Sequence, residues 1–221
     1  MLARTWHATI AVIAFAALAL QLWIAVRVSG TPSGTEVGRL SGATLAGRIL
    51  RTVSFFTIQS NVLAAITSAQ LARRPDRDGQ LWRVIRLDAL VGIAVTGVVY
   101  SAVLAATHDP QGWQQVSTNT ATHYIVPIMM VLGWLLFGPR RRITGRVVAG
   151  SLVFPIVWFG YTLIRGAITP WYPYPFTDVV AHGYVAVSVN ALLVTVLLGA
   201  VSALFWWGDR QLRPAPRAPA G

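Results

Sequence analysis

Long apolar runs alternate with short polar segments along the whole chain. Six of these runs approach or reach the length of a membrane-spanning helix, because a bilayer core of about 30 Å requires roughly 20 apolar residues in helical conformation. The runs lack the alternation of apolar and polar residues that is typical of barrel strands. The predicted spans are residues 8–26, 52–71, 87–107, 123–137, 146–164 and 184–207.

The composition agrees with a membrane protein. Of the 221 residues, 55% are hydrophobic and only 11% are charged, which is too apolar for an ordinary soluble domain. We therefore predict an all-α fold, a polytopic bundle of six transmembrane helices that forms one domain over residues 1–212. Residues 213–221 are Pro-rich and form a predicted disordered cytoplasmic tail.

The basic residues predict the orientation of the bundle. The formal net charge is +11, but all 18 basic residues are Arg and lie in short clusters beside apolar runs, a placement that indicates topology and not nucleic-acid binding. Because Arg-rich loops stay in the cytoplasm, both termini are predicted there. The first loop, with Arg39, Arg48 and Arg51, opposes this trend. The Arg assigned to the cytoplasm are Arg4, Arg73, Arg74, Arg77, Arg83, Arg86, Arg140, Arg141, Arg142, Arg146, Arg210, Arg213 and Arg217.

Polar residues gather in the half of the predicted bundle that lies opposite the Arg clusters. Measured from the cytoplasmic end of each helix at about 1.5 Å per residue, Thr57 lies about 24 Å up and His123 about 22 Å up. Both are therefore expected just beneath the outer interface, facing the bundle interior or a cavity. Asn61 shares the helix face of Thr57. The other polar residues of this half are Gln59, Ser60, His108, Asp109, Asp178, His182 and Asn190.

Each of these residues also has a structural interpretation. Thr57 taken alone is typical of a helix threonine bonded to its own i−4 carbonyl, and Asn61 of a hydrogen bond between helices. The positions of His108 and His182 suit a surface turn and an interfacial cap. His123 differs, because an ionisable ring within a span indicates a functional site.

Three short segments carry a resemblance to a known family. They are Phe-Phe-Thr-Ile-Gln-Ser-Asn at 55–61, His-Tyr-Ile-Val-Pro at 123–127 and Tyr-Pro-Tyr-Pro-Phe at 172–176. With the six-helix plan, they resemble the androgen-induced/androgen-dependent membrane hydrolase family, and the chain looks like a bacterial branch of it. The resemblance implies a threonine hydrolase of the bacterial inner membrane, without metal or other cofactor, that acts on fatty acid esters of hydroxy fatty acids. It implies Thr57 as the nucleophile and His123 as its partner.

The implied chemistry agrees with the residues present. A threonine hydroxyl is a poor nucleophile unless a base takes its proton, and His123 is the available base. Because amides in the middle of a helix are committed to the helix, the expected oxyanion donors are the side chains of Asn61, Asn190 and Tyr174. The lipid substrate is expected to enter laterally from the bilayer. Cysteine is absent, which excludes thiol catalysis, and no Gly-x-Ser-x-Gly elbow is present.

A second hypothesis is a non-enzymatic membrane protein. In this hypothesis His108, His123 and His182, with Asp109 or Asp178, bind a metal or haem or line a transport path. A purified sample with no Soret band and no stoichiometric metal would exclude the cofactor version. Both hypotheses stay open at the level of the sequence, which carries no indication of oligomeric state.

Overall fold

The computed structural model describes residues 1–27 and 38–213, and all regular secondary structure in these residues is helical. The all-α prediction is therefore confirmed. The predicted tail lies outside the described residues except for Arg213. The helices are α1 Leu2–Arg27, α2 Leu45–Ser54, α3 Phe56–Arg73, α4 Gln80–Val99, α5 Gly112–Thr120, α6 Val126–Phe137, α7 Gly145–Ser151, α8 Val153–Ile168 and α9 Val179–Gln211, with π-helical turns η1 Tyr100–Leu104 and η2 Ala121–Ile125 and a 3₁₀ turn η3 Pro175–Thr177.

The helices are those of a multi-pass membrane protein. Within the described residues, five segments are long and apolar enough to cross a bilayer: Leu2–Arg27, Gln80–Leu104, Gly112–Phe137, Gly145–Ile168 and Val179–Gln211. The pair α2 and α3 makes a sixth if it is counted as one span, although the two helices are bent by 71°. The predicted span over residues 52–71 is therefore divided between two helices, because the chain breaks at Phe55 and residues 52–54 belong to α2.

Phe55 produces the break between α2 and α3. Its backbone is extended, with φ −66° and ψ 131°, and its ring packs edge-on against Trp171 and Tyr174 at centroid distances of 5.8 and 5.6 Å. The carbonyl of Ser54, released from the helix ladder, accepts a hydrogen bond of 2.9 Å from the indole of Trp158. Aromatic packing and this replacement bond therefore compensate for the interrupted helix.

Helix α2 lies in the region that was predicted as a loop. Thr44 caps its first turn, with its hydroxyl oxygen accepting the amide of Gly47 at 3.1 Å. Arg48 donates to the carbonyls of Ala25 and Val26 at 2.8 and 3.1 Å, and so satisfies orphan acceptors at the end of α1. This Arg, which opposed the predicted orientation, thus has a structural role.

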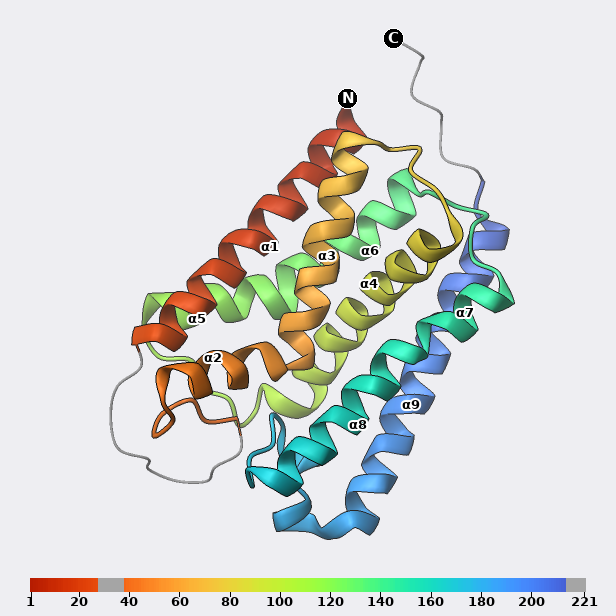
Figure 1. Ribbon diagram of the computed structural model, residues 1–221. Coiled ribbons are helices and arrows are strands. Elements are labelled where there is room, and N and C mark those ends of the chain that lie inside the picture. The colour runs from red at the N-terminus through yellow and green to blue at the C-terminus, as the bar shows by residue number, and fades with distance from the viewer. Residues whose placement is uncertain (28–37, 214–221) are drawn as a thin grey trace.

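The helices form two groups that meet at α4 (Figure 1). Helices α1, α3, α4 and α6 pack around a core that includes Ile10, Ala64, Leu90, Ile93 and Met130. Helices α7 and α9 contact the other side of α4, and α8 runs beside α9. Many large apolar side chains of α8 and α9 are exposed, as expected for surfaces that face lipid.

Candidate active site

A threonine, a histidine and a tyrosine from three distant segments meet near the bend. Thr57 Oγ1 lies 3.4 Å from Nε2 of His123 and 3.1 Å from the phenol oxygen of Tyr174. Thr57 belongs to the first turn of α3, His123 to η2, and Tyr174 to the segment just before η3. The structure therefore brings Thr57 and His123 together, at the level where their sequence positions placed them. The Thr57 hydroxyl bonds these side chains and not its own i−4 carbonyl.

The hydrogen bonds of His123 define its tautomer. Its Nδ1 lies 3.2 Å from the carbonyl oxygen of Asn119, which can only accept, so Nδ1 carries the proton. Nε2 is then unprotonated and accepts the hydroxyl proton of Thr57. Thr122 Oγ1 also contacts Nδ1, at 3.1 Å. The imidazole is thus oriented as a base toward the threonine hydroxyl.

The ring of Tyr100 covers one face of the His123 imidazole. Its ring stacks on that of His123 with centroids 4.0 Å apart and planes 27° from parallel, and its hydroxyl lies 3.0 Å from Nδ1 of His108. Both rings of the stack belong to π-helical turns, which are rare and are frequently found at functional sites. Sequence reasoning missed Tyr100, because a tyrosine inside an apolar run has no distinguishing motif.

A close approach of two backbones positions η2. A Cβ added to Gly97 of α4 would lie 3.1 Å from Pro127 Cβ and 3.2 Å from the carbonyl oxygen of His123. Both distances are shorter than ordinary contacts between such atoms. The absence of a side chain at Gly97 therefore lets the segment that carries His123 pack directly on α4.

The bend changes the chemistry available at Thr57. The prediction that backbone amides here are committed to a helix is wrong, because α3 begins at Phe56 and Thr57 lies in its first turn, where amide groups lack helical partners. The Thr57 amide instead donates to the phenol oxygen of Tyr174 at 3.1 Å. The positive end of the α3 dipole also lies at this point.

Tyr174 is enclosed by aromatic side chains. Its ring stacks on Phe176, with centroids 5.2 Å apart, and lies 6.0 Å from the Trp158 ring. Burial raises the pKa of the Tyr174 phenol above its ordinary value, although the hydrogen bonds from Thr57 partly oppose this shift. The phenol is therefore protonated at neutral pH and is able to donate a hydrogen bond.

The two asparagines hold backbone segments. Asn61 is 0% exposed, and its amide nitrogen donates to the carbonyls of Thr57 and Thr122 at 2.9 and 3.2 Å. It thereby ties α3 to η2. Asn190 of α9 donates to the carbonyl of Phe176 at 3.0 Å and steadies the segment that carries Tyr174.

A largely apolar cavity of about 200 Å³ adjoins the site. Thr57 and Tyr174 lie in its wall, and the rest comes mainly from α4, α8 and α9, including Val99, Trp158 and Leu198. Its extent can be followed along α9, where the lining residues Ala191 and Leu198 are seven residues, about 10 Å of helix, apart. Ile156, which also lines it, is 66% exposed on α8, so the cavity reaches the lipid-facing surface.

The other histidines do not join His123 in a cluster. His108 and His182 are exposed, and His7 is buried in α1. Within residues 1–27 and 38–213, no group of three His, Cys, Asp or Glu side chains has the arrangement of a metal site. Asp178 caps α9 by accepting the amides of Val180 and Ala181. The geometry thus gives no support to the metal-binding hypothesis.

Comparison of the chain with models of protein families, with curated proteins and with solved structures finds no match. The fold and the site define a multi-pass helical membrane protein with a Thr–His–Tyr constellation beside an apolar cavity. Its function therefore has to be inferred from the arrangement of these side chains.

Proposed function

We propose that the protein is a membrane-embedded threonine esterase that hydrolyses lipid esters such as fatty acid esters of hydroxy fatty acids. The observation that carries the proposal is the position of Thr57 Oγ1 between an unprotonated histidine nitrogen and a tyrosine phenol. The resemblance of residues 55–61, 123–127 and 172–176 to the androgen-induced/androgen-dependent hydrolases supports the same activity and placement in a bacterial branch of that family.

Acylation begins with Thr57. Nε2 of His123 accepts the hydroxyl proton as Oγ1 attacks the ester carbonyl carbon, which forms a tetrahedral intermediate. The imidazolium then protonates the oxygen of the leaving alkoxide, and the carbon–oxygen ester bond breaks. The products of this half-reaction are a free alcohol and an acyl group esterified to Thr57.

Deacylation uses the same base. Nε2 of His123 takes a proton from a water molecule, which attacks the carbonyl carbon of the acyl-threonine. Collapse of the second tetrahedral intermediate returns the proton to Thr57 Oγ1 and releases the carboxylic acid. The chain's own residues supply every proton transfer, with water as the only co-reactant.

Two donors are available to the oxyanion. The amide of Thr57 and the phenol of Tyr174 are hydrogen-bonded to each other in the substrate-free site, and the phenol also contacts the Thr57 hydroxyl. An ester oxygen that enters between them receives both donors, without reorganisation of the fold. Asn61 and Asn190, first considered as donors, then act by positioning the backbone.

Tyr174→Phe tests the oxyanion assignment. We expect kcat to fall by about 10²–10³-fold with little change in KM, because a phenol donor acts on charge that develops in the transition state. Tyr184→Phe, at an exposed tyrosine of α9, is the matched control and should retain full activity. Unchanged kcat in folded Tyr174→Phe would remove the phenol from the mechanism.

The apolar cavity is suited to an acyl chain. Its apolar walls can contact a long hydrocarbon chain much as lipid tails do. Its edge at the exposed Ile156 faces the lipid side of α8. A lipid ester therefore reaches Thr57 from within the membrane, and water is needed only for deacylation.

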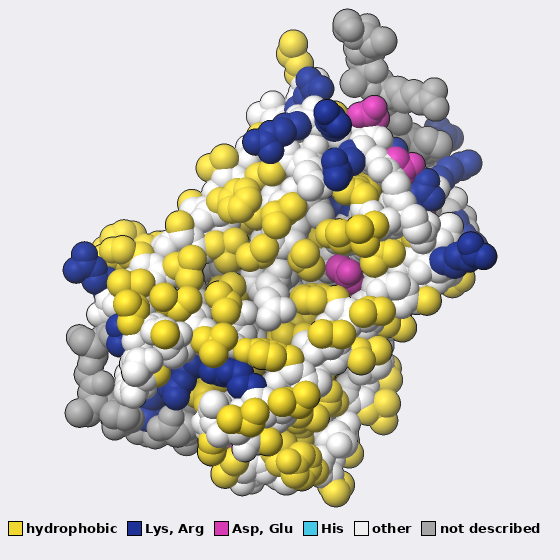
Figure 2. Space-filling view, viewed as in Figure 1, with side chains coloured by type: hydrophobic (Ala, Val, Ile, Leu, Met, Phe, Trp, Pro, Cys, Tyr) yellow, Lys and Arg dark blue, Asp and Glu magenta, His cyan; other side chains and the backbone are white. Residues whose placement is uncertain are grey.

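We infer that the protein lies in the bacterial inner membrane with both termini in the cytoplasm. Figure 2 shows Arg side chains at the end of the bundle that carries the N-terminus and a second group toward the opposite end. The first end carries the Arg clusters of residues 73–86 and 140–146, as the preference of Arg for cytoplasmic loops predicts. The end of α9 lies at this same end of the bundle, which agrees with an even number of crossings and with α2 and α3 forming one span.

Single cysteines test this orientation, because the chain has none of its own. In intact cells, Asp109→Cys should react with a membrane-impermeant maleimide, whereas Asp76→Cys should react only after the inner membrane is permeabilised. Both positions are exposed in connections between helices. The reverse pattern would invert the proposed topology without affecting the catalytic proposal.

A further inference from the structure

Arg86 is a buried cation far from the catalytic residues. It lies on α4, is 4% exposed, and precedes Thr96 of the catalytic cavity by ten residues, about 15 Å of helix. Its Nη1 donates to Thr67 Oγ1 at 3.2 Å and approaches Met130 Sδ at 3.5 Å. Both partners are neutral. Its Nε and Nη2 atoms are buried and have no hydrogen-bond partner.

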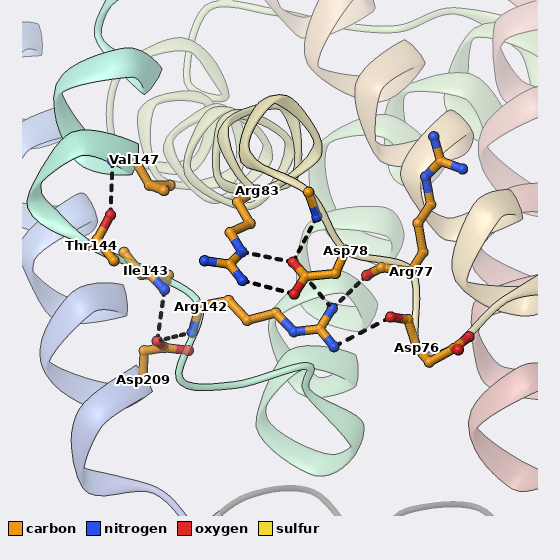
Figure 3. A network of polar contacts seen from close by, with 10 residues as sticks. Asp76, Arg77, Asp78, Arg83, Arg142, Ile143, Thr144, Val147 and Asp209 are labelled. Atoms are coloured by element: carbon orange, nitrogen blue, oxygen red, sulfur yellow. Dashed lines mark hydrogen bonds and ion pairs between the residues drawn. The ribbon is translucent and has the colours of Figure 1, made fainter.

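The carboxylates that contact Arg83, Arg142 and Ile143 are committed to these groups (Figure 3). Asp78 forms two hydrogen bonds of 2.7 Å with Arg83 and lies 3.9 Å from Arg142. Asp209 accepts the backbone amides of Arg142 and Ile143. In the part of the chain that the structure describes, no Asp or Glu lies within 4.0 Å of the Arg86 guanidinium.

A buried guanidinium with neutral partners and unpartnered N–H groups is costly unless another group offsets its charge. Removing a guanidinium from water costs several kcal/mol unless a counter-charge and hydrogen-bond acceptors replace the water. Unpartnered N–H groups in a low-dielectric interior add to that cost. An anion would supply both the counter-charge and the hydrogen-bond acceptors that the Arg86 guanidinium lacks.

A small pocket meets this description. Arg83, Arg86 and Arg142 all lie in its wall, together with the apolar faces of Trp82 and Trp134, and its volume is about 20 Å³. That space is little more than one water-sized sphere. Its inner part has room for a monatomic ion and offers less room to the larger phosphate and sulfate ions. A water molecule also fits, but it brings no charge to neutralise Arg86.

We propose that the pocket lined by Arg83, Arg86 and Arg142 binds a chloride ion. The ion neutralises Arg86 and accepts hydrogen bonds from guanidinium groups. Because Arg83 and Arg86 belong to α4 and Arg142 to the connection between α6 and α7, it links these segments at the end of the bundle that carries the N-terminus. Its function is structural and independent of the proposed esterase activity.

Thermal unfolding in lipid nanodiscs tests the proposal. The wild-type protein is measured at constant ionic strength while chloride replaces gluconate, which is too large for the pocket. We expect Tm to rise with the logarithm of the chloride concentration once this exceeds the Kd, by roughly 3–5 °C for each tenfold increase. Bromide should act like chloride, whereas sulfate should act like gluconate.

Two variants assign the effect to Arg86. Arg86→Met removes the charge and keeps an apolar side chain, so its Tm should not depend on chloride and should equal or exceed that of the wild type in gluconate. Arg74→Gln, at an exposed Arg of the same end, should keep the full chloride response. If the wild-type protein has the same thermal unfolding curve in chloride and in gluconate, the proposal is overturned, whether or not Arg86→Met folds. A chloride response that persists in Arg86→Met overturns it as well.

Discussion

Thr57→Ala is expected to lower ester hydrolysis by at least about 10³-fold and to abolish covalent labelling by a fluorophosphonate probe. The substitution removes the oxygen that bridges His123 Nε2 and the Tyr174 phenol, so the base has no hydroxyl to deprotonate and no tetrahedral oxyanion forms. The measurement is hydrolysis of a fatty acid ester of a hydroxy fatty acid by purified protein, with probe labelling of the same sample.

Controls separate loss of chemistry from loss of structure. Thr9→Ala, at an exposed threonine of α1 whose hydroxyl bonds the carbonyl of Thr5, should leave hydrolysis and labelling unchanged. Thr57→Ser keeps a hydroxyl and should retain part of the activity. Labelling that survives in folded Thr57→Ala would place the nucleophile elsewhere and end the threonine esterase proposal.

His123→Ala is expected to reduce kcat by a similar factor, because Thr57 then loses the imidazole that accepts its hydroxyl proton. The substitution leaves a space beside the Tyr100 ring that is shaped for an imidazole. Added imidazole should therefore restore part of the activity of His123→Ala and none of the activity of Thr57→Ala. The measurement is the rate of hydrolysis against imidazole concentration.

The matched control for His123 is His182→Ala, at an exposed histidine of α9. It should retain full activity, because the esterase proposal gives this side chain no role. If His182→Ala and His123→Ala lose function together, the histidines act as a set, and the metal or transport hypothesis regains support. Full activity of folded His123→Ala without imidazole would exclude this residue as the base.

The helical segments were predicted well because their determinant is local. A backbone that crosses a bilayer must satisfy its amide and carbonyl groups within the segment, so long apolar runs become helices wherever they occur. The fourth run was predicted to begin at His123, but its helix begins at Gly112. Its first turns contain mainly polar residues and therefore do not appear in an apolar pattern.

The pairing of Thr57 with His123 could be anticipated from depth. Thr57 lies 16 residues before Arg73, and His123 lies 15 residues before Gly138, so the depth of each below a helix end follows from the helix rise. Helices in a bilayer run roughly parallel to one another apart from their tilt. Depth alone does not specify rotation about a helix axis. The sequence therefore placed the two residues at one level, and packing of α3 against η2, through Asn61, turned them toward each other.

What the sequence alone determined is the class of structure: apolar helices that cross a membrane, with an alcohol and an imidazole at matching depth. Only the tertiary structure decided that the chain bends at Phe55, which frees the Thr57 amide, and that Tyr174 reaches this amide from a segment 117 residues away. It also decided that Arg86 is buried with no Asp or Glu of the described residues within 4.0 Å of its guanidinium. The physical reason is that hydropathy and helix rise act within one segment, whereas these features depend on contacts between segments that are distant along the chain.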